Sequence, residues 1–271
     1  MLAPARHARH NAIVMRCFDF TQAIVRAPGR SVVDGLSAQD GPAPDFAAVV
    51  REHDGYARAL AACGLDVTML DPLEAHPDAL FVEDPALVFP EGAIVLRPGA
   101  PSRADEAALL RPALERHFAD VQVLDDGHAD GGDVMVTPDV VMIGLSARTD
   151  AAGAVALSAA LARLGRRAMM VVPPAGALHL KTIASLIDEE TILTTPEGAA
   201  SGLFSRFRQI VLAPDEAAAA NAVRINDTLL LPAHHPRIAD QLAGLGHHLM
   251  LLDTTHVARI DAGLSCMSLR W

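Results

Sequence analysis

The sequence predicts an α/β fold in which five ββαβ units form a closed ring. Three observations support this prediction: a weak internal repeat, short turns between paired strands, and one unit whose two parts lie at opposite chain ends. The repeats start at residues 84, 133, 181, 221 and 266, in steps of 49, 48, 40 and 45 residues. Because a unit of this size cannot bury its own apolar face, neighbouring units must pack side by side around an axis.

Each unit opens with a polar residue, followed by two short apolar strands and a turn between them. The predicted strand pairs occupy residues 85–89 and 93–98, 134–136 and 140–145, 182–187 and 191–196, and 222–225 and 228–233. The connecting turns are only two or three residues long (PEG, TPD, DEE and ND). Turns this short join antiparallel strands, so each pair is predicted to be a hairpin.

A helix and a third strand follow the hairpin in three of the units. The predicted helices span 103–118, 150–165 and 236–246, and the strands that follow span 121–125, 169–173 and 247–253. The third unit is degenerate, because residues 201–212 fit the pattern only loosely.

The N-terminal part of the chain supplies the elements that the truncated fifth unit lacks. It contains a strand over 21–28, a helix over 45–64 and a strand over 66–72, which complete the unit begun at 266–271. A doubly wound parallel sheet is the alternative fold for alternating strands and helices. The hairpin turns and the lack of a Gly-rich strand-to-helix loop favour the ring.

We expect one domain. Residues 1–14 are predicted to be a disordered extension, and 15–271 a single catalytic domain. The segment 28–44 contains three Pro and three Gly with little periodicity. A loop of this length in a compact domain is usually functional or disordered, and beside the axis it could serve as a lid.

Composition excludes several classes of protein. The chain has 271 residues, 51% of them hydrophobic, and a formal net charge of −11. It therefore lacks the basic character of most nucleic-acid binders. No apolar run approaches the roughly 18 residues of a membrane span, and the N-terminus lacks a secretory signal. With three cysteines, which cannot all pair within the chain, a cytoplasmic location is expected.

The polar residues that open the units should gather at one end of the axis. They are Glu83, Asp84, Asp130, Asp133, His179, Lys181, Asn221 and Cys266. A thiol, an imidazole and carboxylates in one place permit nucleophilic catalysis. Taken singly, each residue has an ordinary structural explanation, such as a core thiol or an Asp-Gly turn. Their shared position in the repeat favours a functional explanation.

A metal site is not expected. The acidic run 125–133 resembles a calcium loop, but Thr137 stands where a bidentate Glu is needed. The His pairs 234–235 and 247–248 consist of adjacent residues, which face opposite sides of a strand. The HExxH and CxxC motifs are both missing from the sequence.

The chain resembles the dimethylarginine dimethylaminohydrolases, including their bacterial members. The matching motifs extend from about Thr21 to Trp271: RAPGRSVVDGL, EHDGYARAL, FVEDPALV, LRPGAPSR, DGGDV, GLSARTDAAGA, LHLKT and SCMSLRW. The family belongs to the amidinotransferase and arginine deiminase superfamily. The resemblance implies an α/β-propeller of five ββαβ modules with pseudo-fivefold symmetry, in agreement with the repeat.

The resemblance also implies an activity: hydrolysis of Nω,Nω-dimethyl-L-arginine and Nω-monomethylarginine to L-citrulline plus dimethylamine or methylamine. Cys266 would be the nucleophile that forms a covalent thiouronium intermediate, His179 the general acid and base, and Asp130 the carboxylate that orients His179. The residues matching the family's substrate-binding positions are Leu36, Asp78, Glu83, Asp84, Arg103, Arg148, Ile260 and Ser265. No cofactor or metal is implied, and a homodimer is expected.

Two positions depart from the family pattern. Asp130 stands where bacterial members tend to carry Glu, and Ala262 stands where Gly is usual. Three other activities stay open. The same residues could serve an arginine deiminase or another guanidino hydrolase, the run 125–133 could serve a metal-dependent hydrolase, and the ring could be a non-catalytic binder of arginine-like ligands.

Overall fold

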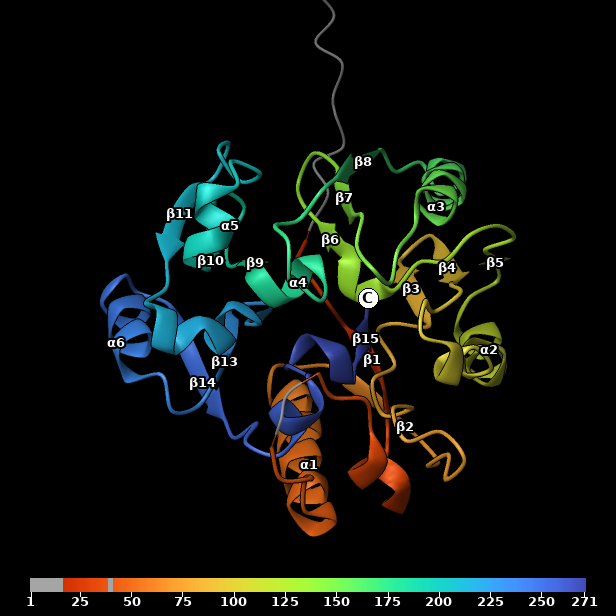
Figure 1. Cartoon of the computed structure of the whole chain (residues 1–271), viewed down its shortest axis with the longest axis horizontal. Helices are drawn as coiled ribbons and strands as arrows, with labels where there is room; N and C mark the ends of the chain where they lie inside the picture. The colour runs from red at the N-terminus through yellow and green to blue at the C-terminus, as the bar shows by residue number, and fades with distance from the viewer. Residues whose placement is uncertain (1–16, 39–40) are drawn as a thin grey trace, which may run out of the picture.

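Five small sheets surround one axis in the computed structural model, which describes residues 17–38 and 41–271 (Figure 1). Each sheet has three strands, the first antiparallel to the second and the second parallel to the third. The strands of the four continuous sheets are β3 (Ala86–Phe89), β4 (Gly92–Val95) and β5 (Val121–Val123); β6 (Val134–Val136), β7 (Val141–Gly144) and β8 (Ala168–Val171); β9 (Ala184–Leu186), β10 (Thr191–Thr194) and β11 (Arg208–Val211); and β12 (Val223–Ile225), β13 (Thr228–Pro232) and β14 (His248–Leu252). The five predicted ββαβ units are confirmed.

The fifth sheet closes the ring by joining the two ends of the chain. Its middle strand β1 (Gln22–Arg26) pairs antiparallel with β15 (Leu269–Arg270) and parallel with β2 (Asp66–Leu70). The split unit predicted from the sequence is therefore present. Because β15 begins three residues after Cys266, this pairing ties the segment that carries Cys266 to β1, near the start of the described residues.

Helices cover the outside of the ring. They are α1 (Phe46–Ala62), α2 (Glu106–His117), α3 (Ala151–Arg163) and α6 (Pro236–Gly244) (Figure 1). In the third unit, the short helix α5 (Pro196–Ala200) takes the place of a long one, which explains why the repeat is weak there. The Asp45 and Asp150 side chains cap α1 and α3 by accepting backbone N–H groups at 2.8 and 2.7 Å.

The apolar core lies between units rather than within them. Five buried clusters are present, and each joins residues of two neighbouring units. In one of them, Ile94 of β4 packs with Ile143 of β7 and Leu157 of α3, all fully buried. This arrangement agrees with the expectation that a single unit cannot bury its own apolar face.

The segment 28–44 is ordered over its described residues. A short 3-10 helix spans Arg30–Asp34, and the Leu36 N–H donates to the Asp78 carboxylate at 2.9 Å. Residues 39–40, and the predicted disordered extension 1–14, lie outside the described residues. Within 17–38 and 41–271, none of the helices combines the length and the apolar character needed to cross a membrane.

His53 of α1 should make the fold sensitive to acid. It is fully buried, and neither ring nitrogen has a hydrogen-bond partner among the described residues. Burial lowers the pKa of His53 from 6.5 to about 4. Between pH 6.5 and 4, His53 binds a proton in the unfolded chain but not in the folded one. The folding stability that is present above pH 6.5 is therefore lost as the pH falls towards 4. The expected loss is about 3 kcal/mol.

Urea unfolding of the wild type and of His53→Leu across pH 4–7 measures this effect. The variant should lose less stability than the wild type over that window, since leucine has nothing to protonate. Equal slopes for the two proteins would show that His53 does not carry the acid sensitivity.

Candidate active site

The polar residues that open the units meet at one end of the axis, around a small pocket. Of the residues predicted from the sequence, the pocket is lined by Leu36, Asp78, Asp84, Arg103, Arg148, His179, Ile260 and Cys266. Phe81, Leu178, Asp261 and Ala262 complete the lining. Residues far apart in the sequence therefore share one cavity, whereas Asn221, the polar residue that opens the fourth unit, does not line it.

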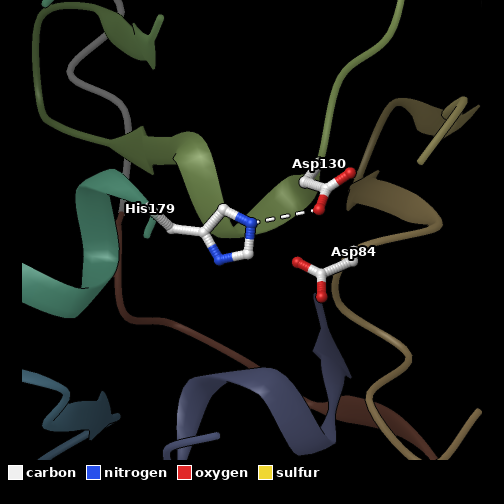
Figure 2. Close-up of side chains that lie close together, drawn as sticks. All are labelled: Asp84, Asp130 and His179. Carbon is white, nitrogen blue, oxygen red and sulfur yellow. Dashed lines mark hydrogen bonds and ion pairs between the residues drawn. The ribbon is translucent and has the colours of Figure 1, made fainter. Parts of the chain in front are cut away.

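His179 and Asp130 form a buried hydrogen-bonded pair. His179 directly precedes the short helix α4 (Leu180–Ile183), and its Nε2 lies 3.0 Å from Asp130 Oδ2 (Figure 2). The Gly99 N–H donates to the other Asp130 oxygen at 2.7 Å. The aspartate side chain is thus long enough to reach the imidazole. Burial would lower the pKa of His179, but Asp84 and the bond to Asp130 outweigh it and raise that pKa.

Asp133 supports both members of this pair from behind. One of its oxygens accepts the Leu180 N–H at 2.9 Å, which fixes the backbone beside His179. The other accepts the hydroxyl of Thr149 at 2.8 Å, and that hydroxyl accepts the Asp130 N–H at 3.1 Å. Asp133 is fully buried. The sequence indicated that it lies with the other polar residues at this end of the axis, but not that it supports His179 and Asp130.

Asp84 is the carboxylate that faces the pocket beside His179 (Figure 2). Its oxygens accept bonds from Arg103 Nη1 at 2.5 Å and from the Gly132 N–H at 3.0 Å. Burial would raise the pKa of Asp84, but His179 and Arg103 outweigh it and hold that pKa below its ordinary value. Asp84 is therefore an anion at neutral pH and suits a cationic group in the pocket.

A cation could in principle occupy the same group. Asp84, Asp130 and His179 each offer one ligand atom, and these atoms lie within 4.8 Å of one another. All three side chains are already engaged, however. Asp84 pairs with Arg103, and Asp130 pairs with His179. A metal ion would have to displace these partners.

The two arginines of the pocket differ in how their guanidinium groups are used. Arg103 is buried, and its nitrogens donate to Asp84, to Glu106 and to the carbonyls of Asp78 and Phe81. The Arg148 side chain is 21% exposed, and its nearest carboxylate is Asp130 at 3.9 Å. Of the two predicted carboxylate clamps, Arg148 is the one whose guanidinium can accept a new anion without losing strong bonds.

Cys266 lies in a short 3-10 helix, Ser265–Met267, and its Sγ accepts the Gly263 N–H at 3.5 Å. Desolvation, together with the nearby charges of Glu83 and Asp84, raises the pKa of the Cys266 thiol to about 12. Without a cation in the pocket the sulfur is therefore a neutral thiol. A bound cation would oppose the two carboxylates and favour the thiolate.

Glu83 and Ser265 lie behind the pocket and do not line it. Ser265 Oγ donates to Glu83 at 2.8 Å, and Lys181 Nζ lies 2.5 Å from the other Glu83 oxygen. Asn221 holds Ser265 by two bonds, of 2.8 and 3.1 Å, and also donates to the Lys181 carbonyl at 3.2 Å. This layer ties the turn that carries Cys266 to the helix that follows His179.

The family departure at Ala262 has a simple structural account. The left-handed residue of this turn is Asp261, with φ of 54°, whereas Ala262 is not among the residues of positive φ. An alanine therefore fits the backbone there. Nothing in the sequence singled out Asp261 as a pocket residue.

Comparison with known proteins agrees with this geometry. The arginine deiminase family model matches residues 70–229. The chain is 37% identical over 254 residues to the N(G),N(G)-dimethylarginine dimethylaminohydrolase of Pseudomonas aeruginosa, covering 93% of this chain and all of the relative. It is 34% identical to the Streptomyces coelicolor protein of the same name, covering 92% of this chain and 96% of the relative.

The chain belongs to the dimethylarginine dimethylaminohydrolase family. A solved structure of the Pseudomonas aeruginosa family member, a cysteine-to-serine mutant in complex with citrulline, superposes with a TM-score of 0.91 at 37% identity. The match covers 94% of this chain and all of that one. The fold and the family resemblance inferred from the sequence are both confirmed.

Proposed function

We propose that this chain is a dimethylarginine dimethylaminohydrolase that converts Nω-methylated arginines to L-citrulline and a methylamine. One observation carries the proposal: Cys266, His179 and the anionic Asp84 line a single pocket. The family contributes the reaction, since the relatives are named dimethylarginine dimethylaminohydrolases and one of them was crystallised with citrulline, the proposed product. Residues 15–271 would act as one catalytic domain.

Asp84 would hold the guanidinium and so present its central carbon to the thiol. That carbon is a poor electrophile because its charge is spread over three nitrogens, so orientation matters. The same bound cation would lower the pKa of Cys266 from its raised resting value. Binding of substrate would therefore generate the nucleophile. Glu83, behind the pocket, would act through Ser265 and Lys181 rather than by direct contact.

His179 would move the protons in both halves of the reaction. In the first, the Cys266 thiol loses its proton to solvent as the cation binds, and the sulfur bonds to the guanidinium carbon. The carbon–nitrogen bond to the methylated nitrogen then breaks, and His179 gives its proton to the departing amine. In the second, a water attacks the thiouronium carbon while His179 takes a proton from it. The carbon–sulfur bond then breaks and the sulfur takes the second proton of that water, which releases citrulline and restores the thiol and the protonated His179.

The amino-acid end of the substrate would lie at the mouth of the pocket. Arg148 would bind the α-carboxylate, while Arg103 would hold Asp84 in place. Asp78, Leu36 and the backbone at Ile260, which line the pocket, would bind the α-amino group. The Leu36 N–H donates to Asp78, so the part of the loop around Leu36 would close this end of the pocket.

Replacement of Arg148 by alanine is expected to raise KM by about 10- to 100-fold and to change kcat little. A charge-assisted hydrogen bond to a carboxylate contributes about 1.5–3 kcal/mol, and this one is remote from the reacting carbon. Steady-state kinetics of Arg148→Ala and Arg148→Lys would measure it, with partial recovery in the lysine variant. A large fall in kcat at unchanged KM would contradict this assignment.

Citrulline release from asymmetric dimethylarginine and from arginine, assayed side by side with a chelator present, tests the function as a whole. The proposal expects citrulline mainly from the methylated substrate, with no effect of the chelator. Citrulline mainly from arginine would move the activity to the deiminase side. Loss of activity in chelator would favour a metal at Asp84, Asp130 and His179.

A further inference from the structure

A second cavity lies back to back with the substrate pocket. It has a volume of about 180 Å³ and is lined by the first strand of every unit, β3, β6, β9, β12 and β15, together with residues 17–20. The two cavities share no lining residue. Glu83 and Ser265 line this second cavity, whereas their chain neighbours Asp84 and Cys266 line the substrate pocket. We call this space the axial cavity.

The axial cavity carries an excess of positive charge. Its lining contains four permanent cations, Arg166, Lys181, Arg224 and Arg270, against the two carboxylates of Asp19 and Glu83. Arg166 also pairs at 2.8 Å with Glu91, which lies outside the lining, so cations still exceed carboxylates by one. The chain as a whole has a net charge of −11, so the charge of this lining has the opposite sign to that of the whole protein. Low-dielectric walls preserve the field of such a group, and the charge therefore favours an anion.

Two hydrogen-bond donor groups of the axial cavity have fewer acceptors among the described residues than they can use. The Lys181 ammonium has three N–H donors, and the described residues supply one acceptor, Glu83. The Ser185 side chain has 8% exposure, and its hydroxyl has no hydrogen-bond partner among the described residues. Buried polar atoms are normally paired. A carboxylate offers acceptors of the kind that both groups lack.

Much of the remaining wall is apolar. Ala86, Val134, Leu186, Val223 and Leu269 line it and are all buried. An apolar cavity of about 150 Å³ is large enough to bind benzene. The volume therefore suits a ligand with a small hydrocarbon body as well as a charged end.

We propose that the axial cavity is a second ligand site, which takes a small organic carboxylate with an apolar body of about benzene size. Its carboxylate would bind beside Lys181 and Ser185, and its body would contact the strand residues of the wall. The site is distinct from the pocket that holds Cys266. It depends on no step of the proposed reaction, so a binding measurement tests it whether or not the chain hydrolyses methylarginines.

Calorimetric titration of the full chain with benzoate is the experiment. Benzoate is anionic at neutral pH, and benzamide serves as a neutral probe of the same shape. The expected result is a 1:1 complex with a Kd of about 1 mM or tighter for benzoate, and at least tenfold weaker binding of benzamide. No heat with benzoate up to about 10 mM would overturn the proposal, as would equal binding of the two probes.

Paired variants locate the binding. Lys181→Met and Ser185→Val should each weaken benzoate at least tenfold, and both are used in case one folds poorly. Arg148→Ala removes a cation from the substrate pocket, and Ser158→Val makes the same serine exchange on α3. Both controls should bind benzoate like the wild type. Loss of binding in Arg148→Ala alone would place benzoate in the substrate pocket and refute the second site.

Discussion

Cys266→Ser is expected to abolish citrulline formation, with kcat lowered at least about a thousandfold, while the protein stays folded. A serine hydroxyl ionises far less readily than a thiol, and the pocket already disfavours an anion at this position, because burial, together with Glu83 and Asp84, raises the pKa of the Cys266 thiol. The exchange removes one sulfur atom from a half-buried side chain. Citrulline release and the thermal unfolding midpoint measure the two halves of this expectation.

Cys63→Ser is the matched control. Cys63 is also a half-buried free thiol, but it caps the C-terminus of α1 and does not line the pocket. This variant should keep wild-type activity. If Cys266→Ser keeps more than about a tenth of the activity, the thiol is not the nucleophile. If it unfolds at a much lower temperature, its loss of activity says nothing about chemistry, and calorimetric binding of citrulline becomes the deciding measurement.

His179→Ala should lower kcat about 100- to 10,000-fold, because the same imidazole is proposed to donate and then accept a proton.

Asp130→Asn tests how the pKa of the His179 imidazole is set. Burial disfavours charge on His179, while Asp84 and Asp130 raise its pKa. Without the Asp130 charge that pKa falls. His179 then loses its proton at lower pH, and the alkaline decline of kcat should begin at lower pH than in the wild type.

The pH profile separates this tuning from damage to the fold. Asp126→Asn removes an exposed carboxylate from the same segment and should leave the profile in place. A uniform fall in kcat for Asp130→Asn, with the alkaline limb unmoved, would mean that Asp130 only holds the backbone. An alkaline limb shifted upward would contradict the assigned sign of the interaction.

Local sequence patterns were sufficient to predict the architecture. Hairpin turns such as Asn226–Asp227, apolar strand pairs and helix signals act over a few residues, and their repetition predicted five units and the split one. The third unit was the weak point, because α5 is too short to show helical periodicity. The gathering of Asp84, His179 and Cys266 also followed from the repeat, since equivalent positions of a ring must lie at the same end.

The sequence by itself therefore determined the ring, its closure and the chemical groups at one end of the axis. Only the tertiary structure decided which neighbour of each pair faces which cavity, Asp84 and Cys266 towards one and Glu83 and Ser265 towards the other. It also decided that Arg103 is bound by Asp84 and Glu106 while Arg148 is not. Such choices depend on side-chain direction and on partners from other units, which no local pattern encodes.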